Sequence, residues 1–100
     1  MPIIHMKYSF TEDNINHYAP NRPGVYGLYD SLDTPIYYGK SDASIQERLK
    51  RHISGAEGQC TQYASTFNFE IVNNPIQRER ELLEEFKRTY GKLPKCNDVI

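Results

Sequence analysis

Residue types that transfer protons and bind anions are concentrated between Pro23 and His52. Tyr26 and Tyr37 lie in two short apolar runs, and Arg48 and His52 follow four residues apart. Phenols and imidazoles exchange protons, whereas a guanidinium holds an anion through two parallel N–H donors. The segment therefore carries side chains suited to acid–base chemistry beside an anionic group, provided that the fold brings them together.

A β-hairpin is predicted to position the two tyrosines. Segments 25–29 and 36–38 are rich in β-branched and aromatic residues, and the turn-forming sequence DSLDTP separates them. Because side chains alternate between faces and paired residues share a face, a short turn pairs Tyr26 with Gly39 and places Tyr37 beside Tyr26. At Gly39, where the second strand should end, a side chain would crowd whatever approaches Tyr26. The opposite face takes the other large side chains of the hairpin, namely Val25, Tyr29, Ile36 and Tyr38.

A capped helix is predicted to follow the hairpin and to carry Arg48 and His52. Ser44 and Glu47 match the capping box, in which a hydroxyl residue precedes a carboxylate by three positions. The helix should run to about residue 53 and stop at Gly55. Because Arg48 and His52 are four residues apart, they stand one above the other beside the buried stripe. That stripe consists of Ile45, Leu49 and Ile53.

A later helix places one carboxylate on a predicted buried face. A strand-like alternation at 67–72 leads through a turn into a helix from Pro75 to about Tyr90, which Gly91 should end. The apolar stripe of this helix passes through Glu79, and a buried charge is costly without a partner. Glu79 is therefore either an ion-pair partner or a functional carboxylate. The stripe comprises Ile76, Leu83, Phe86 and Tyr90, and the candidate ion-pair partners are Arg78, Arg80 and Arg48.

The ends of the chain and its central loop are predicted to support this arrangement. Hydroxyl residues ending at Thr11 precede a short helix whose inner side should carry Ile15 and Tyr18. Residues 55–66 are expected to form a loop with one helical turn, and residues 92–100 an extended segment packed on the body.

The composition predicts one globular domain, 1–100, since 38% of its 100 residues are hydrophobic. No apolar run approaches the roughly 20 residues of a membrane span, and the start lacks a secretory signal, so a cytoplasmic location without membrane contact is expected. Cys60 and Cys96 have no further ligand at metal-binding spacing, and free, reduced thiols are expected. The formal charge is -1, yet residues 40–52 hold four basic and two acidic side chains, a local excess that favours anion binding.

These motifs, in this order, resemble the GIY-YIG nuclease family. The first signature reads GVY at 24–26 and the second YYG at 37–39, and an arginine–histidine pair and a helical glutamate follow. The resemblance covers a core of residues 23–97, in which Pro94 and Asn97 resemble the segment after the glutamate helix. It implies a small α/β (α+β) domain with a three-stranded antiparallel sheet flanked by helices.

The resemblance also implies roles for the residues of the hairpin. Tyr26 would position or deprotonate the attacking water, and Tyr37 would hydrogen-bond the water or the phosphate. Gly39 and Lys40 would bind the substrate, with Lys40 in contact with a phosphate. Whether Tyr26, Tyr37 or His52 is the general base stays open at this point.

The helices would supply the remaining chemistry by the same resemblance. Arg48 would neutralise the non-bridging phosphate oxygens, and His52 would shuttle a proton. Glu79 would be the sole protein ligand of a Mg²⁺ or Mn²⁺ ion that keeps most of its waters. Glu85 is the alternative ligand if the helix is aligned differently with the family.

The implied function is a divalent-metal-dependent endonuclease that hydrolyses DNA phosphodiester bonds. No separate DNA-recognition motif accompanies the domain, so it should show little sequence selectivity or depend on a protein partner or on branched or damaged DNA. The alternative is a catalytically weak module that keeps the fold and binds nucleic acid or a partner.

Overall fold

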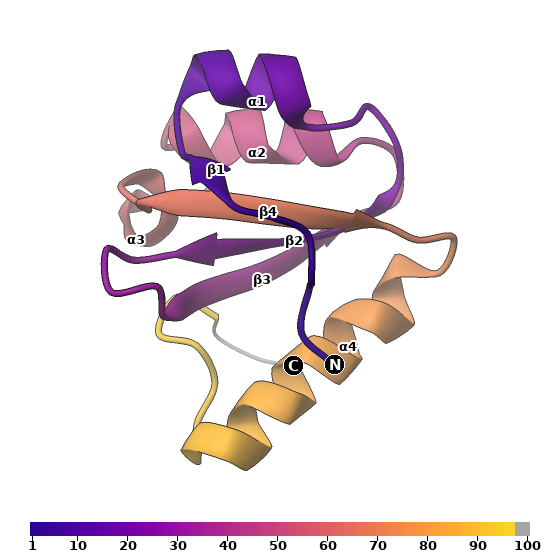
Figure 1. Ribbon diagram of the computed structural model, residues 1–100, viewed down its shortest axis with the longest axis vertical. Coiled ribbons are helices and arrows are strands. Elements are labelled where there is room, and N and C mark those ends of the chain that lie inside the picture. Colours follow the sequence, from indigo (N-terminus) through magenta and orange to yellow (C-terminus); the bar gives the residue numbers. More distant parts are fainter. Residues whose placement is uncertain (98–100) are drawn as a thin grey trace.

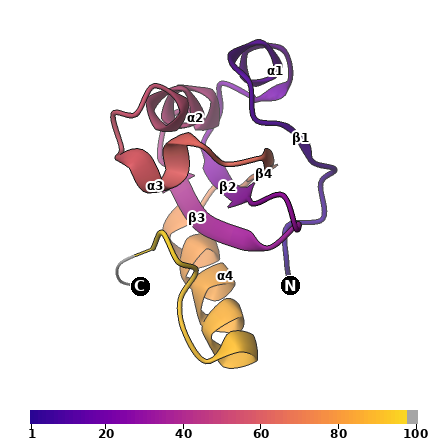
Figure 2. The same ribbon diagram turned by 90° about the vertical axis from the view of Figure 1, so that its left-hand side faces the viewer.

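A four-stranded antiparallel sheet separates the helices into two layers. The computed structural model describes residues 1–97. Its elements are β1 (Tyr8–Ser9), α1 (Glu12–Tyr18), β2 (Gly24–Tyr29), β3 (Pro35–Ser41), α2 (Ile45–Ile53), α3 (Gln59–Gln62), β4 (Thr66–Ile71) and α4 (Pro75–Tyr90). The strand order is β1-β4-β2-β3, with α1 and α2 on one face and α4 across the other (Figures 1 and 2). No helix of the described chain is long and apolar enough to span a membrane.

The register of the hairpin confirms the predicted placement of the two tyrosines. Tyr26 pairs with Gly39, and Leu28 pairs with Tyr37, so both tyrosines face α2. A shift in register follows Leu28. The resulting bulge turns Ile36 into the core on the Tyr26 side, so the prediction that Ile36 lies on the opposite face was wrong.

The prediction that the second strand ends at Gly39 was wrong. β3 continues to Ser41, which pairs with Gly24 at the start of β2. The predicted crowding toward Tyr26 is nevertheless confirmed, because a Cβ on Gly39 would lie 2.5 Å from the Tyr26 ring and hydroxyl and 2.7 Å from the Tyr37 ring. Glycine is thus required here for close packing against the aromatic pair.

The Ser44 half of the predicted capping box of α2 forms, whereas the Ser44 N–H donates to Ser41 Oγ at 2.8 Å and not to the Glu47 side chain. Ser44 Oγ accepts a hydrogen bond from the Glu47 backbone N–H at 3.1 Å. Ile45 and Leu49 lie on the sheet-facing side of the helix and are fully buried. This cap and this stripe fix the rotation of the helix, and they turn His52 inward while leaving Arg48 partly exposed.

The α4 helix has the predicted limits but a shorter buried face. Leu82, Leu83 and Phe86 pack against Val25 and Tyr38 in the core on the second face of the sheet. Two residues of the predicted stripe are exposed instead, since Ile76 is 53% and Tyr90 58% accessible. In Figure 1, α4 crosses the sheet obliquely, and the residues that pack into the core come from its middle turns. Asn74 stands at the N-cap position but makes no capping hydrogen bond with its side chain.

The N-terminal region adds a fourth strand that the sequence analysis did not predict. In β1, Tyr8 pairs with Phe67 and Ser9 with Thr66. Two residues are too few to show an alternating pattern. The α1 helix begins with its predicted Thr11 cap. Its inner side carries Ile15, but Tyr18 is exposed and stacks on Tyr8, with ring centroids 4.0 Å apart.

The two cysteines form a disulfide, which corrects the expectation of free thiols. Cys60 in α3 is bonded to Cys96 in the C-terminal segment. That segment packs on the body, as predicted, and the structure places it along the free edge of β3. The Cys96 N–H donates to the Ile36 carbonyl, and the Asn97 side-chain amide exchanges two hydrogen bonds with the Tyr38 backbone. Residues 98–100 of the predicted extended segment lie outside the described residues.

Candidate active site

Three of the predicted site residues form an aromatic cluster between the hairpin and α2. The ring centroids of Tyr26 and Tyr37 are 6.2 Å apart. The His52 ring lies 5.4 Å from the Tyr26 ring and 4.9 Å from the Tyr37 ring. The hairpin register and the phase of α2 thus bring together residues that the sequence separates by up to 26 positions.

A hydrogen-bonded chain runs through the interior of this cluster. The Tyr26 hydroxyl lies 2.7 Å from His52 Nε2, and His52 Nδ1 lies 2.7 Å from Thr61 Oγ1. All three side chains are almost completely enclosed, with exposures of 0% for Tyr26, 1% for His52 and 3% for Thr61. Tyr37 is partly exposed, so it is the member of the cluster that solvent reaches.

Burial holds both Tyr26 and His52 in their neutral forms at neutral pH. Burial is the main cause that raises the pKa of Tyr26 far above its usual range, and the nearby Tyr37 adds to it, while Arg48 opposes the shift. Burial also lowers the pKa of His52 from 6.5 to about 4. A neutral imidazole has one N–H donor and one free lone pair, so His52 is able to accept a proton from a neighbour.

The lowered pKa of His52 predicts a loss of stability in mild acid. Above about pH 6.5, His52 is neutral in the folded and the unfolded chain. Between 6.5 and about 4 the unfolded chain binds a proton that the folded protein excludes, so the free energy of unfolding falls by up to about 3 kcal/mol and then levels off. Urea denaturation across this pH range measures the effect. His52→Gln should lose most of this slope, whereas the exposed His17→Gln should keep it; an unchanged slope in His52→Gln would contradict the assignment.

Arg48 lies within electrostatic range of the aromatic cluster. It is partly exposed, and it lowers the pKa values of both Tyr26 and Tyr37. Its Nε atom is buried and has no hydrogen-bond partner within residues 1–97. An unsatisfied buried donor is uncommon in a folded protein, and this guanidinium retains donor capacity for an anion.

Glu79 reaches the same region from the opposite layer. Burial raises the pKa of the Glu79 carboxyl, and Lys40 and Arg48 oppose that shift through their charges. The Glu79 charge in turn helps to raise the pKa of Tyr37, after burial. Glu79 therefore stands within electrostatic range of three other predicted site residues, although α4 lies on the opposite face of the sheet from α2.

The candidate ion-pair partners of Glu79 leave its carboxylate uncommitted. Arg78 binds Glu70 instead, through Nε at 2.7 Å and Nη2 at 3.0 Å. Within residues 1–97 Glu79 forms no ion pair or hydrogen bond with Arg48 or Arg80. Lys40 pairs with Asp42 at 3.1 Å, and both side chains remain accessible. The half-buried Glu79 carboxylate is thus available to a ligand.

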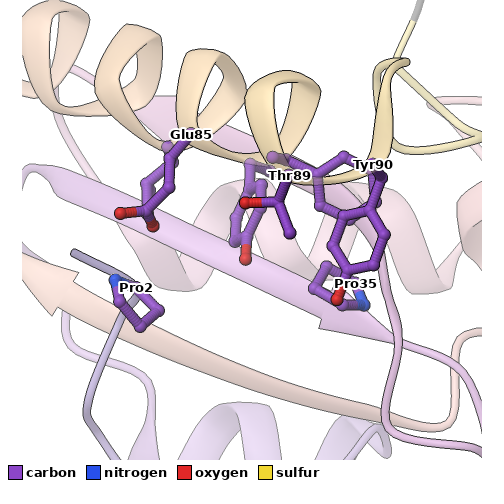
Figure 3. A pocket seen from close by; sticks show the side chains of 8 residues that line it. Pro2, Pro35, Glu85, Thr89 and Tyr90 are labelled. Carbon is purple, nitrogen blue, oxygen red and sulfur yellow. The ribbon is translucent and has the colours of Figure 1, made fainter.

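Glu85, the alternative metal ligand, lies away from the aromatic cluster. Its carboxylate accepts a hydrogen bond from the N-terminal amino group of Met1 at 2.7 Å. Figure 3 shows it with Pro2, Pro35 and Thr89 around a separate pocket of about 280 Å³ on the α4 face of the sheet. Glu85 lines this pocket together with Tyr38, whereas Glu79 is the carboxylate within electrostatic range of Tyr37, Lys40 and Arg48.

The donor set fits a metal bound by a single protein carboxylate. No group of three or more histidine, cysteine, aspartate or glutamate side chains converges anywhere in the described chain. Within residues 1–97, Glu79 is a carboxylate without an ion pair that lies within electrostatic range of Arg48 and Tyr37. Mg²⁺ is commonly held by one or two carboxylates together with water and substrate phosphates. The residues present are therefore compatible with Mg²⁺ or Mn²⁺ and do not form a preformed cage.

Thr61 is the residue of the cluster that the sequence analysis missed. It lies in the segment 55–66, which was predicted as a loop with one helical turn and which contains the short helix α3. No motif or periodicity marks a single threonine in such a segment. Only the folded chain brings its hydroxyl to His52, nine residues earlier.

Comparison with known proteins agrees with this architecture. The GIY-YIG catalytic domain matches residues 22–92. Over 44 residues the chain is also 40% identical to methionine aminopeptidase 2 of Candida dubliniensis and 36% identical to methionine aminopeptidase 2 of Candida albicans. These matches cover 44% of this chain but only 10% of the length of those proteins, so they do not transfer the activity of the whole relatives. The family match spans most of the chain, including both signature strands and the glutamate helix, and the protein belongs to the GIY-YIG family of catalytic domains, which implies a nuclease-type function.

Proposed function

We propose that the protein is a divalent-metal-dependent endonuclease that hydrolyses phosphodiester bonds in DNA. The observation that carries this proposal is the aromatic cluster of Tyr26, Tyr37 and His52, with Arg48 and Glu79 within electrostatic range of it. Phosphodiester hydrolysis needs a proton acceptor for water, a cation for the phosphate oxygens and help for the leaving oxygen. This grouping offers a residue for each of the first two needs and a carboxylate that fits the metal.

Arg48 and Lys40 are the proposed phosphate ligands. The guanidinium of Arg48 can donate two parallel hydrogen bonds to the non-bridging oxygens, where negative charge increases during the reaction. The amino group of Lys40 can hold a neighbouring phosphate as a point charge. Asp42, its present partner, is exposed, and such a surface pair costs little to exchange for a phosphate.

The tyrosines and His52 are the proposed route for the proton of the attacking water. Tyr37 reaches solvent and orients the water. As the water oxygen forms its bond to phosphorus, the water passes a proton to the Tyr26 oxygen, and Tyr26 passes its own hydroxyl proton to Nε2 of His52. The bond from phosphorus to the leaving oxygen breaks, and that oxygen takes a proton from solvent. The 2.7 Å contact between Tyr26 and His52 supports this order.

Glu79 is the proposed protein ligand of Mg²⁺ or Mn²⁺. When bound, the metal supplies a Lewis acid for the phosphoryl oxygen and stabilises the charge that develops there. Glu79 on the α4 side and Arg48 on the α2 side would then hold the scissile phosphate between them.

The proposal predicts that Arg48→Lys loses at least about 100-fold in cleavage rate, because lysine cannot reproduce the paired donors. The assay is nicking of supercoiled plasmid and of branched DNA by the purified protein with Mg²⁺, Mn²⁺ or a chelator. The matched control is Arg51→Lys, since Arg51 is on the surface and pairs with Glu57 at 2.6 Å. Cleavage that persists in the chelator or in Arg48→Lys would contradict the proposal.

A second function is favoured by one observation, the complete enclosure of Tyr26. A module whose catalytic tyrosine stays closed to water would bind nucleic acid or a partner without cleaving it. In that case the wild type binds DNA in a salt-dependent way, and neither metal nor branched substrate elicits nicking. The same plasmid assay, run beside a binding titration, separates the two functions.

A further inference from the structure

The disulfide between Cys60 and Cys96 joins two segments that lie against the candidate active site. Cys60 directly precedes Thr61, whose hydroxyl oxygen lies 2.7 Å from His52 Nδ1. The backbone N–H of Cys96 donates to the Ile36 carbonyl on β3. The bond thus ties the short helix that contacts His52 to the edge strand of the hairpin.

The α3 helix has little stability of its own. It has four residues and no side-chain hydrogen bond at its N-cap, and so short a helix is marginal without tertiary support. Among residues 59–63 only Thr61 is buried, whereas Cys60 and Tyr63 are exposed. Segments with few buried side chains open locally at a lower free energy than the core does. The disulfide therefore supplies a support that α3 itself lacks.

The disulfide is accessible to a reductant from the side of Cys60. Cys60 is exposed, whereas Cys96 is partly buried and packs against the core that contains Tyr26. Exposed disulfides are generally the labile and regulatory ones. The Cys60 sulfur is thus the atom that an incoming thiolate reaches first.

We propose that the Cys60–Cys96 disulfide is a redox switch, which encloses His52 when it is oxidised and exposes His52 when a dithiol reduces it. Once the bond is broken, α3 is no longer fastened to β3, and the contact between Thr61 and His52 opens to water. Catalysis by the site should then weaken, because the ring of His52 is no longer held in place. The effect on catalysis rests on the proposed nuclease function, whereas the exposure of His52 does not.

The reduction is an exchange of thiols with a disulfide. A thiolate of the dithiol forms a bond to the Cys60 sulfur, the bond between the two cysteine sulfurs breaks, and Cys96 leaves as a thiolate. The second thiolate of the dithiol then attacks the first sulfur of the dithiol, and Cys60 leaves. The protein gains two electrons, the two protons lost by the dithiol end on the two cysteines, and the dithiol becomes a disulfide.

The experiment measures how fast each histidine reacts with diethyl pyrocarbonate, with the products mapped by mass spectrometry. Oxidised protein is compared with protein that was reduced by dithiothreitol and then desalted without oxygen. His52 is 1% exposed, whereas His5 and His17 are exposed and serve as internal standards. Reduction should raise the His52 rate at least about 10-fold, since losing a crosslink of this span shifts an opening equilibrium by more than that. The rates of the two standards should stay unchanged.

Two variants separate the switch from a general loss of stability. The double variant Cys60→Ser, Cys96→Ser should react at His52 like the reduced wild type, with or without dithiothreitol. Leu82→Ala truncates a buried side chain in the core on the other face of the sheet, so it weakens the fold but leaves the disulfide intact. In its oxidised form this variant should keep the slow His52 rate.

Plasmid cleavage by the same samples tests the effect on catalysis. Reduction should lower the cleavage rate roughly 10–100-fold, in the range that a small misplacement of a reacting group costs. Reoxidation should restore both the cleavage rate and the slow reaction of His52.

An unchanged His52 rate after reduction overturns the proposal. So does a reduced protein that has lost its helical circular dichroism, because it is unfolded as a whole and not opened at α3. A faster His52 reaction with an unchanged cleavage rate overturns the regulation of catalysis. A protein whose His52 responds to reduction but which cleaves no DNA in either state overturns the proposed function and leaves the switch in His52 exposure standing.

Discussion

Replacing Glu79 by glutamine is expected to lower Mg²⁺-dependent cleavage by at least about 100-fold, in the range typical of losing one transition-state contact. Glutamine has the shape of glutamate but lacks the negative charge that a hard cation prefers. The fold should not suffer, because burial raises the pKa of Glu79 and thus disfavours its charged form in the folded protein. Plasmid nicking rates, Mn²⁺ binding and thermal unfolding measure the three parts of this prediction.

Glu85→Gln is the matched control for that variant. Both glutamates lie on α4, but Glu85 contacts the N-terminal amino group and lines the pocket in Figure 3. Cleavage should therefore stay near the wild-type rate in Glu85→Gln. The reverse pattern, in which Glu85→Gln is inactive and Glu79→Gln is active, would assign the metal to Glu85 and refute the site built around Tyr37 and Arg48.

Removal of the disulfide is expected to have the largest effect on stability. Cys60 and Cys96 are separated by 36 residues. In the chain-entropy model, opening a loop of this length lowers the free energy of unfolding by about 3–4 kcal/mol. The double variant Cys60→Ser, Cys96→Ser should show this loss in urea denaturation. The expected loss is a sizeable share of the roughly 5–15 kcal/mol that stabilises a typical domain.

Measuring stability in the presence of a reductant separates the effect of losing the disulfide from the effect of the serine substitutions. Wild-type protein in excess dithiothreitol should approach the stability of the double variant, and the double variant should not respond to dithiothreitol. Equal stability of the wild type with and without reductant would show that the bond contributes nothing. The cytoplasmic location stays a prediction, and the oxidation state of the two cysteines bears on it, because disulfides are uncommon in reducing compartments.

Local sequence patterns correctly predicted the features that depend only on residues close together in the chain. The register that places Tyr26 opposite Gly39 follows from side-chain alternation and a short turn, and it is confirmed. The Ser44 cap and the limits of α4 were predicted from residues adjacent in the chain, and they are confirmed as well. Capping, turns and alternation depend on neighbours in sequence, so they can be inferred without the fold.

Features that depend on the packing of one helix or strand against another were predicted wrongly or not predicted. The stripe on α4 was extended to Ile76 and Tyr90 because periodicity gives the direction of a face but not the length that another layer covers. Ile36 was assigned to the wrong face because a bulge changes the parity of a strand and leaves no mark in composition. The pairing of Cys60 with Cys96 depends on the return of the C-terminal segment to β3, which the spacing of two cysteines does not reveal.

The sequence by itself determined which residues are candidates for chemistry: the two signature tyrosines, Arg48, His52 and Glu79. Residue type and local spacing are enough for that, because they fix what each side chain can do and which helix or strand carries it. The tertiary structure alone decided that Tyr26 and His52 are enclosed in a hydrogen-bonded chain ending at Thr61, and that Glu79 rather than Glu85 is within electrostatic range of Arg48. Burial and distances across the sheet arise from the packing of two layers, and that packing sets the protonation states on which any catalysis by this chain depends.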